Sequence, residues 1–247
     1  MVKKIVGTGV LLVLALALQA GVKMYTLKSP DGKVKLEVTA GQGIAYSLFY
    51  DGRLLLKPSR IALHTDLPEA DHWENIRITG TKQRHVSETV QAPFYRVKEF
   101  GIDCNELELR LNNGFSLLMR AYNDGMAYRF VAGRKGEMTV VEERAEFNFA
   151  DDFEAYIPYS TNPKDPWNMA FQNFYTKAPL TQYNTELPAF LPLTVDAGAV
   201  KLTLLESDLE AYPGMFVCGD GKTPALKGVF AAYPQETFKN KWRCQET

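Results

Sequence analysis

Apolar and polar residues alternate along much of the chain, beginning at residues 33–39. Val34, Leu36 and Val38 fall on one side of that segment, and lysine, glutamate and threonine side chains fall on the other. A period of two residues is typical of a strand that buries one face and exposes the other. The segment is therefore predicted to be a half-buried β-strand.

Short turn signals separate further segments of this kind. Asp51-Gly52 lies between two apolar stretches, and an Asp-Gly pair suits the positive φ angles of a tight hairpin turn. Turn residues at 112–114 and 123–125 divide the next three predicted strands in the same way. The other predicted strands lie between Gly, Pro, Asp or Asn residues, at 138–149, 191–195, 201–205 and 227–232.

Many short strands and almost no sustained helical period predict an all-β protein built as a large β-sandwich. The chain has 247 residues, a length that all-β sandwiches often reach as one domain. We therefore expect one main domain over residues 21–247. Residues 156–192 interrupt the strand pattern with prolines and aromatic residues, so they are predicted to form an aromatic-rich loop region.

The first twenty residues have the order of a secretory signal peptide. Lys3 and Lys4 precede an apolar run over residues 10–18, and small-residue Ala20 follows it. We expect cleavage near Ala20 and a periplasmic or secreted product, with an uncleaved anchor as the alternative. No later segment approaches the roughly 20 apolar residues that a membrane helix needs, so no membrane partner is expected.

Charge and cysteine content exclude several classes of function. Lys plus Arg number 28 against 29 for Asp plus Glu, so no net positive field would attract nucleic acid. The cysteines Cys104, Cys218 and Cys244 have no CxxC spacing, and no histidines cluster with them, so a zinc site is not indicated. Export permits one disulfide, but three reduced thiols fit the sequence equally well.

The chain lacks the motifs of several enzyme classes, and no catalytic residue is assigned within it. No GxSxG elbow, phosphate loop, HExxH or dinucleotide fingerprint is present. The acidic pairs Glu142-Glu143 and Asp151-Asp152 suggest the two carboxylates of a glycosidase. Adjacent residues on a strand point to opposite faces, however, so both pairs are predicted to be surface charge.

The segment 204–216 carries the most distinctive chemistry. Glu206, Asp208 and Glu210 directly follow an apolar strand. Oxygen-rich clusters suit calcium, which takes six to eight oxygen ligands, although the spacing is not that of an EF-hand. From composition alone, a solvated turn after a strand is the alternative.

Four segments together resemble the N-terminal domain of glycoside hydrolase family 97, which comprises exported α-glucosidases and α-galactosidases typical of gut Bacteroidetes. They are residues 27–33 (LKSPDGK), 46–59 (YSLFYDGRLLLKPS), 120–130 (RAYNDGMAYRF) and 206–215 (ESDLEAYPGM). The resemblance implies a β-supersandwich like that of galactose mutarotases, packed against a C-terminal (β/α)8 barrel that holds the catalytic residues. We expect this chain to stop before that barrel and to be inactive alone.

The resemblance also implies functional residues. In the family a calcium ion near the substrate is held mainly by barrel glutamates, with one glutamate from the sandwich, and Glu206 matches that position. Asp208 and Glu210 are weaker candidates for the substrate-binding surroundings. The implied reaction is hydrolysis of a terminal α-linked sugar of an oligosaccharide, with either inversion or retention. The chain departs from the family at residues 172–173, where Gln and Asn stand between aromatics in place of a glutamate.

Two other functions compete with this hypothesis. A carbohydrate-binding module without catalysis would stack sugar on exposed aromatics, for which Trp167 and Tyr175 are the candidates. An aldose epimerase would need a histidine acid and a carboxylate base in one cleft. The three histidines, His64, His72 and His85, lie within a short stretch of the sequence, which argues against the epimerase.

Overall fold

Antiparallel strands form nearly all of the regular structure. The computed structural model describes residues 22–167, 172–209 and 212–232, together with the backbone of residues 237–239 and 244–246. Within these ranges the helical content is a single 3-10 turn, η1 (Leu180–Gln182). The predicted all-β class is confirmed. None of the helices in the described ranges is long and apolar enough to cross a membrane.

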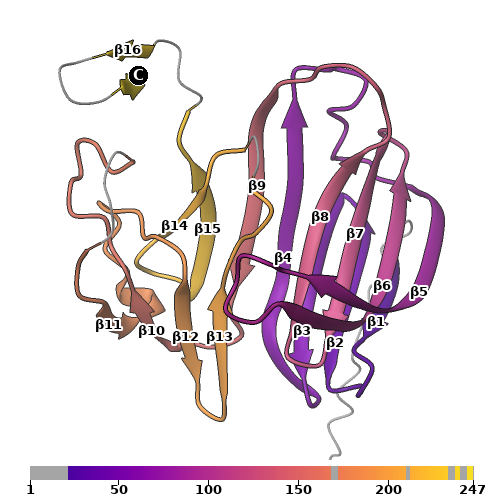
Figure 1. Cartoon of the computed structure of the whole chain (residues 1–247), viewed down its shortest axis with the longest axis horizontal. Coiled ribbons are helices and arrows are strands. Elements are labelled where there is room, and N and C mark those ends of the chain that lie inside the picture. Colours follow the sequence, from indigo (N-terminus) through magenta and orange to yellow (C-terminus); the bar gives the residue numbers. More distant parts are fainter. Residues whose placement is uncertain (1–21, 168–171, 210–211, 233–236, 240–243, 247) are drawn as a thin grey trace, which may run out of the picture.

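One large sheet runs through the whole molecule (Figure 1). It has seven strands, and each neighbouring pair is antiparallel. In spatial order they are β1 (Lys23–Lys28), β2 (Val34–Gly41), β3 (Gly43–Tyr50), β4 (Arg53–Thr65), β9 (Val140–Asn148), β15 (Ala225–Phe230) and β14 (Met215–Gly219).

Two four-stranded sheets accompany the large sheet. The first contains β5 (Ile78–Gln91), β6 (Glu99–Leu111), β7 (Phe115–Tyr122) and β8 (Gly125–Ala132) in sequence order. The second has the order β11 (Thr176–Pro179), β10 (Glu154–Ile157), β12 (Leu193–Ala197) and β13 (Val200–Leu204). A separate pair joins β16 (Thr237–Lys239) to β17 (Cys244–Glu246). Buried side chains from the large sheet and both four-stranded sheets belong to one hydrophobic cluster, as a sandwich requires.

The local sequence explains the first hairpins. Val34, Leu36 and Val38 are each at most 3% exposed, so the predicted alternation matches the observed inner face of β2. Asp51 and Gly52 have φ angles of 48° and 78°, and both values lie in the left-handed region that a two-residue hairpin turn of this hand requires. The Asp-Gly turn between β3 and β4 is confirmed.

Aromatic side chains connect β8 to the opposite sheet. The rings of Tyr46 on β3 and Tyr128 on β8 lie 5.9 Å apart, and the Trp73 and Phe130 rings lie 5.2 Å apart, edge to face. The Tyr46 hydroxyl donates a hydrogen bond to the Glu146 carbonyl at 3.2 Å, and burial raises the pKa of Tyr46 far above its usual range. These contacts fix the position of β8 above the centre of the large sheet.

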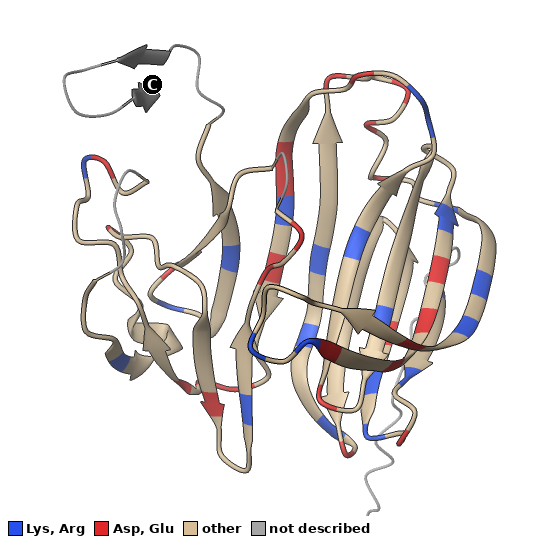
Figure 2. Cartoon of the chain, viewed as in Figure 1, with Lys and Arg blue, Asp and Glu red and all other residues tan. Residues whose placement is uncertain are grey.

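Charged residues of both signs are interspersed over the strands (Figure 2). The most buried acid of the ion pairs in the described residues is Glu106 on β6, which is only 4% exposed on the outer face of the β5–β8 sheet. Arg84 Nε donates to one carboxylate oxygen at 2.6 Å, and Arg120 Nε donates to the other at 2.8 Å. Glu106 is paired with both arginines in the strand register, so the three side chains form one row across the sheet.

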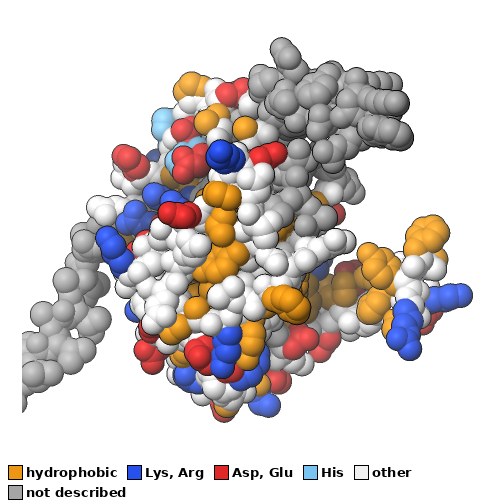
Figure 3. All heavy atoms as spheres, turned by 90° about the vertical axis from the view of Figure 1, so that its left-hand side faces the viewer, with side chains coloured by type: hydrophobic (Ala, Val, Ile, Leu, Met, Phe, Trp, Pro, Cys, Tyr) orange, Lys and Arg blue, Asp and Glu red, His pale blue; other side chains and the backbone are white. Residues whose placement is uncertain are grey.

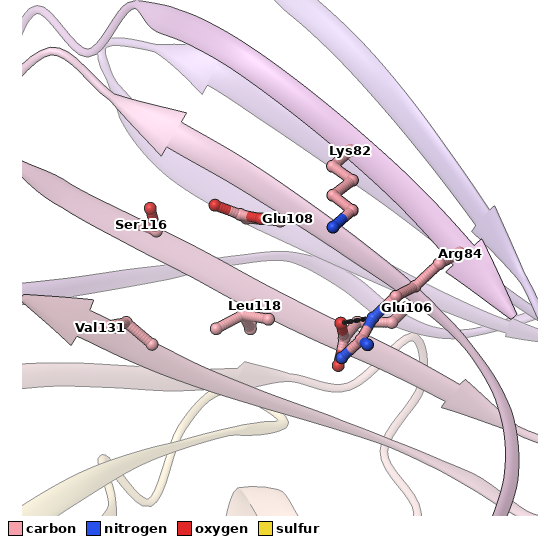
Figure 4. A pocket seen from close by; sticks show the side chains of 7 residues that line it. All are labelled: Lys82, Arg84, Glu106, Glu108, Ser116, Leu118 and Val131. Carbon is pink, nitrogen blue, oxygen red and sulfur yellow. Dashed lines mark hydrogen bonds and ion pairs between the residues drawn. The ribbon is translucent and has the colours of Figure 1, made fainter. Parts of the chain in front are cut away.

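The row borders a shallow hollow of about 300 Å³, and Figure 4 shows Arg84 and Glu106 side by side there. Burial by itself raises the pKa of Glu106, but the hydrogen bonds from Arg84 and Arg120 outweigh burial and hold the pKa below its usual value. The ionised carboxylate is thus the form that the fold stabilises.

The two cysteines with described side chains are free thiols. Cys104 is buried and Cys218 is partly buried. Burial raises the pKa of both thiols, which favours the unreactive protonated form. The side chain of Cys244 lies outside the described part of the chain.

Substitution Glu106→Gln should lower the free energy of unfolding by about 1–3 kcal/mol at neutral pH, because it leaves two guanidinium groups without their shared carboxylate. The folded-state pKa lies below the ordinary value of 4.5, so the carboxylate contributes stability above pH 4.5 and loses it as the pH falls through the folded value. Urea denaturation should therefore show a constant difference around neutral pH that shrinks in acid.

The matched control is Glu108→Gln, two residues along the same strand, where the carboxylate is 4.0 Å from Arg110 and the side chains of Glu108 and Arg110 are 31% and 60% exposed. Its effect should stay below about 1 kcal/mol. Equal effects of the two substitutions would contradict a special role for Glu106.

Candidate functional site

The segment 205–214 connects two sheets and carries Glu206. It leaves β13 after Leu204 and enters β14 at Met215. Glu206 Oε2 accepts a hydrogen bond from the Met215 backbone N–H at 2.8 Å. This bond joins the residue near the end of β13 to the first residue of β14. Within the described part of the chain, no donor binds the second oxygen, Oε1. Burial raises the pKa of Glu206, and the Met215 hydrogen bond opposes that rise.

A glycine makes room for this carboxylate. A Cβ atom at Gly214 would lie 3.3 Å from Glu206 Oε1, which is tighter than an ordinary van der Waals contact. The position before Met215 therefore favours a residue without a side chain. Backbone and carboxylate approach each other here because nothing intervenes.

Glu143 on β9 is the second acid of the site, and its predicted role as surface charge is wrong. Glu142 is exposed, whereas Glu143 is partly buried on the same side of the strand as Ala145 and Phe147. The Tyr212 hydroxyl donates a hydrogen bond to Glu143 Oε2 at 2.7 Å. Burial raises the pKa of Glu143, the Tyr212 bond lowers it, and the charge of Glu206 raises it further.

Tyr212 ties the segment to the body of the sandwich. Its ring lies 5.9 Å from the ring of Phe230 on β15 in an edge-to-face arrangement. Burial and the neighbouring Glu143 both raise the pKa of Tyr212. Burial also raises the pKa of Tyr128 on β8, and Glu143 and Tyr212 add to that rise. Sequence reasoning missed Glu143 and Tyr212, although the alternation toward Ala145 and Phe147 could have placed Glu143 on the inner face.

The two acids suit a cation whose remaining ligands come from outside this chain. Glu143 and Glu206 are neighbouring carboxyl groups with raised pKa values, so a bound positive charge would stabilise their ionised forms. Among the described residues, however, no three His, Cys, Asp or Glu side chains are grouped so that they could hold a metal ion. Calcium takes six to eight oxygens, so Glu206 fits the role of one ligand among several and not of a whole site.

Asp208, the next acid of the predicted cluster, does not join Glu206. Asp208 has a φ angle of 63°, its side chain is 69% exposed, and its carboxylate lies 3.6 Å from Arg129 Nη1 of β8. It pairs across to the neighbouring sheet and is solvated. Glu210 lies outside the described residues.

Of the two aromatic candidates, Trp167 contacts β14 through Phe216. The Trp167 ring, which is 38% exposed, contacts the Phe216 ring edge to face at 4.9 Å. Successive side chains on a strand point to opposite faces, so Phe216 points away from the side of Met215. Tyr175 is 45% exposed. On the face shown in Figure 3, apolar side chains form a narrow line among polar ones.

The histidines of the epimerase hypothesis make local contacts. His64 Nδ1 lies 2.7 Å from Asp71, and His85 Nε2 lies 3.0 Å from Asp103. His85 and Asp103 are both more than half exposed. The described residues therefore do not place a histidine and a carboxylate together in an enclosed cleft.

A comparison with protein families identifies the chain. The model of the glycosyl-hydrolase 97 N-terminal domain matches residues 27–245. The chain belongs to the glycosyl-hydrolase 97 family. The matched range includes β2 to β15 and the segment that carries Glu206.

Two curated relatives of this family 97 domain share its sequence over different lengths. It is 39% identical over 231 residues to a retaining α-galactosidase of Bacteroides thetaiotaomicron, covering 91% of this chain and 34% of the relative. It is 26% identical over 158 residues to a probable retaining α-galactosidase of Streptomyces bingchenggensis, covering 62% and 24%. The chain thus spans about one third or less of the length of these relatives.

Solved structures support the fold of the family 97 domain. A family 97 enzyme from Pseudoalteromonas sp. strain K8, in complex with panose, matches with a TM-score of 0.69 at 18% identity, over 83% of this chain and 32% of that one. A β-arabinopyranosidase matches with a TM-score of 0.71 at 20% identity, over 84% and 35%. At such low identities the match establishes the sandwich architecture alone.

Substitution Tyr212→Phe should lower the free energy of unfolding by about 1–2 kcal/mol, because Glu143 would lose its donor in a partly buried position. The pKa of Glu143 should rise further, since the bond that lowers it is gone. Urea denaturation and an NMR titration of the Glu143 carboxyl measure the two effects. Tyr156→Phe, at an exposed tyrosine of β10, is the control, and an unchanged Glu143 pKa in Tyr212→Phe would refute the assignment.

Proposed function

We propose that this chain is the N-terminal domain of a calcium-dependent, exo-acting α-glycoside hydrolase and that it forms one wall of the active-site cleft. Two observations support the proposal: the chain belongs to glycosyl-hydrolase family 97, and it spans only 34% of the length of its Bacteroides relative. The catalytic acid and nucleophile or base would belong to a C-terminal (β/α)8 barrel. The sandwich alone would be inactive.

The geometry of Glu206 is the observation that carries the proposal. One carboxylate oxygen is fixed by the Met215 N–H, while Gly214 leaves space around the other. Tyr212 and Glu143 hold the segment against β9 and β15. A carboxylate held in this way presents one oriented oxygen ligand, and barrel residues would supply the remaining ligands.

Calcium, when bound, would supply Lewis-acid polarisation near the glycosidic bond. The residues of this chain would position that chemistry. Glu206 would offer Oε1, the Met215 N–H would keep its carboxylate from rotating, and Glu143 would add negative charge nearby. The raised pKa values of both acids agree with a site that favours added positive charge.

An α-galactoside is the substrate class that the comparisons favour. The relative with 39% identity is a retaining α-galactosidase, so hydrolysis of a terminal α-linked galactose with retention is the first reaction to test. A terminal α-linked glucose is the second. The lysine pair and apolar run before Ala20 support an exported, periplasmic or secreted protein.

Activity should appear only when the domain is joined to a catalytic part. The test compares the purified chain with a fusion protein, in which this chain precedes the remaining part of the Bacteroides relative. Both would be assayed with p-nitrophenyl α-galactoside and α-glucoside in the presence of calcium. Hydrolysis by the chain alone would overturn the proposal and require an active site within these residues. Binding of oligosaccharide by the chain, with no hydrolysis by either protein, would favour a carbohydrate-binding module.

Substitution Glu206→Gln in the fusion protein should raise the free calcium concentration needed for half-maximal activity at least about tenfold, because one charged ligand is lost. Activity measured against free calcium concentration, buffered with EGTA, gives the midpoint. Asp208→Asn is the matched control: it lies two residues away in an exposed ion pair and should change the midpoint less than about twofold. Equal midpoints for Glu206→Gln and the unchanged protein would remove Glu206 from the ligand set.

A further inference from the structure

The distal half of the β5–β6 hairpin projects from the sandwich without support. The pairing of β6 with β7 ends at Cys104 and Tyr122, whereas β6 and β5 continue to pair from Ser87 and Asp103 outward. The ribbon closes with a hydrogen bond from the Ala92 N–H to the Lys98 carbonyl at 2.7 Å. We call residues 87–103 the arm. None of its residues is buried.

The figures show where the arm points. In Figure 1 it crosses the front of the sandwich toward the side on which β13 lies, and in Figure 3 it stands clear of the body at the right. Open space therefore separates the free end of the arm from the sandwich. The segment that carries Glu206 begins where β13 ends, on the side toward which the arm extends.

The exposed surface of the arm is unusually apolar. Phe94 is 98% exposed and Tyr95 is 72% exposed, and three more large apolar side chains of this segment are at least 41% exposed: Val90, Val97 and Phe100. Soluble proteins rarely gather such side chains at a surface unless they contact a partner. A two-stranded ribbon is also marginally stable alone in water. Both facts indicate that the arm binds a surface outside this chain.

We propose that the arm is a clamp that binds the catalytic part of the enzyme, the part that relatives carry beyond the region matched here. This inference rests on the proposed function. The chain spans 34% of the Bacteroides relative and 32% of the Pseudoalteromonas enzyme, so the part of those proteins beyond the match is large enough to fill the space beside the arm. A partner that completes the ligands around Glu206 would lie on the side toward which the arm extends.

Charge defines the surface that the arm fits. Arg96 and Lys98 lie beside Phe94 and Tyr95 at the tip, and basic residues mark the turn of the ribbon in Figure 2. The complementary surface is an apolar patch bordered by acidic side chains. The aromatic side chains would enter the patch, and the basic side chains would pair at its edge.

Hydrogen exchange of the arm tests the clamp directly. Amides of residues 88–100 should exchange rapidly in this chain, where the ribbon pairs only with itself, and at least about tenfold more slowly in the fusion protein defined above. This readout does not depend on hydrolysis. A fusion protein that is inactive but has a protected arm would refute the proposed reaction and still support the binding of the arm to the catalytic part.

The double substitution Phe94→Asp and Tyr95→Asp separates contact from folding. Both side chains are solvent-exposed, so the melting temperature of the isolated chain should not change. In the fusion protein the melting temperature should fall by at least about 2 °C, and the protection of the arm should be lost. Met24→Asp is the matched control, because Met24 is 62% exposed on β1 outside the arm and should leave both readouts unchanged.

Two results would overturn the clamp. Rapid exchange of residues 88–100 in the fusion protein would show that the catalytic part does not cover the arm. Slow exchange in the isolated chain that depends on protein concentration, and that Phe94→Asp with Tyr95→Asp abolishes, would instead assign the arm to contact with a second copy of this chain. Sedimentation of the isolated chain identifies that second case.

Discussion

Apolar burial between the seven-stranded sheet and the two four-stranded sheets is the interaction on which the other features depend. Leu36, Leu109 and Leu117 are fully buried, and each such side chain contributes about 1.5–3 kcal/mol. Because the cluster is continuous, the strands that meet at its margin have fixed positions. β13 and β14 therefore fix the two points between which the segment that carries Glu206 runs, and β15 and then β9 follow β14 in the order of the large sheet.

The structure treats its carboxylates in two opposite ways. Glu106 is almost fully buried, yet two guanidinium groups satisfy it and lower its pKa. Glu143 and Glu206 are less buried, have only one described donor each, and have raised pKa values. The first arrangement is electrostatically complete within the chain. The second is incomplete, which is the property expected of acids that await a positive charge from outside.

The sequence predicted the strands whose two faces differ. β2 and β7 alternate cleanly because one face meets the core. β5 was not predicted, because its residues are polar on both sides and only Val86 is buried. The short strands β10 and β11 were hidden by the proline-rich composition around them. Periodicity can report a face only where burial makes that face apolar.

The candidate site was only partly readable for a related reason. Glu206 was found through a resemblance, and composition alone did not distinguish it from Asp208, which the structure places in an exposed pair with Arg129. Glu143 was predicted to be surface charge together with Glu142, although strand parity allows only one residue of an adjacent pair to lie on the outer face. Tyr212 had no signal of its own, since its importance depends on a partner about seventy residues away along the chain.

The strand order of the large sheet also constrains how the chain folds as it is synthesised. β9 lies between β4 and β15, so Ala145 pairs with Ile61 on one side and Phe147 pairs with Leu226 on the other. The sheet therefore remains open along one edge of β9 until the region near Phe230 has emerged. A nascent chain halted earlier would present a free strand edge to other chains, so the domain gains protection from aggregation only when its last sheet strands arrive.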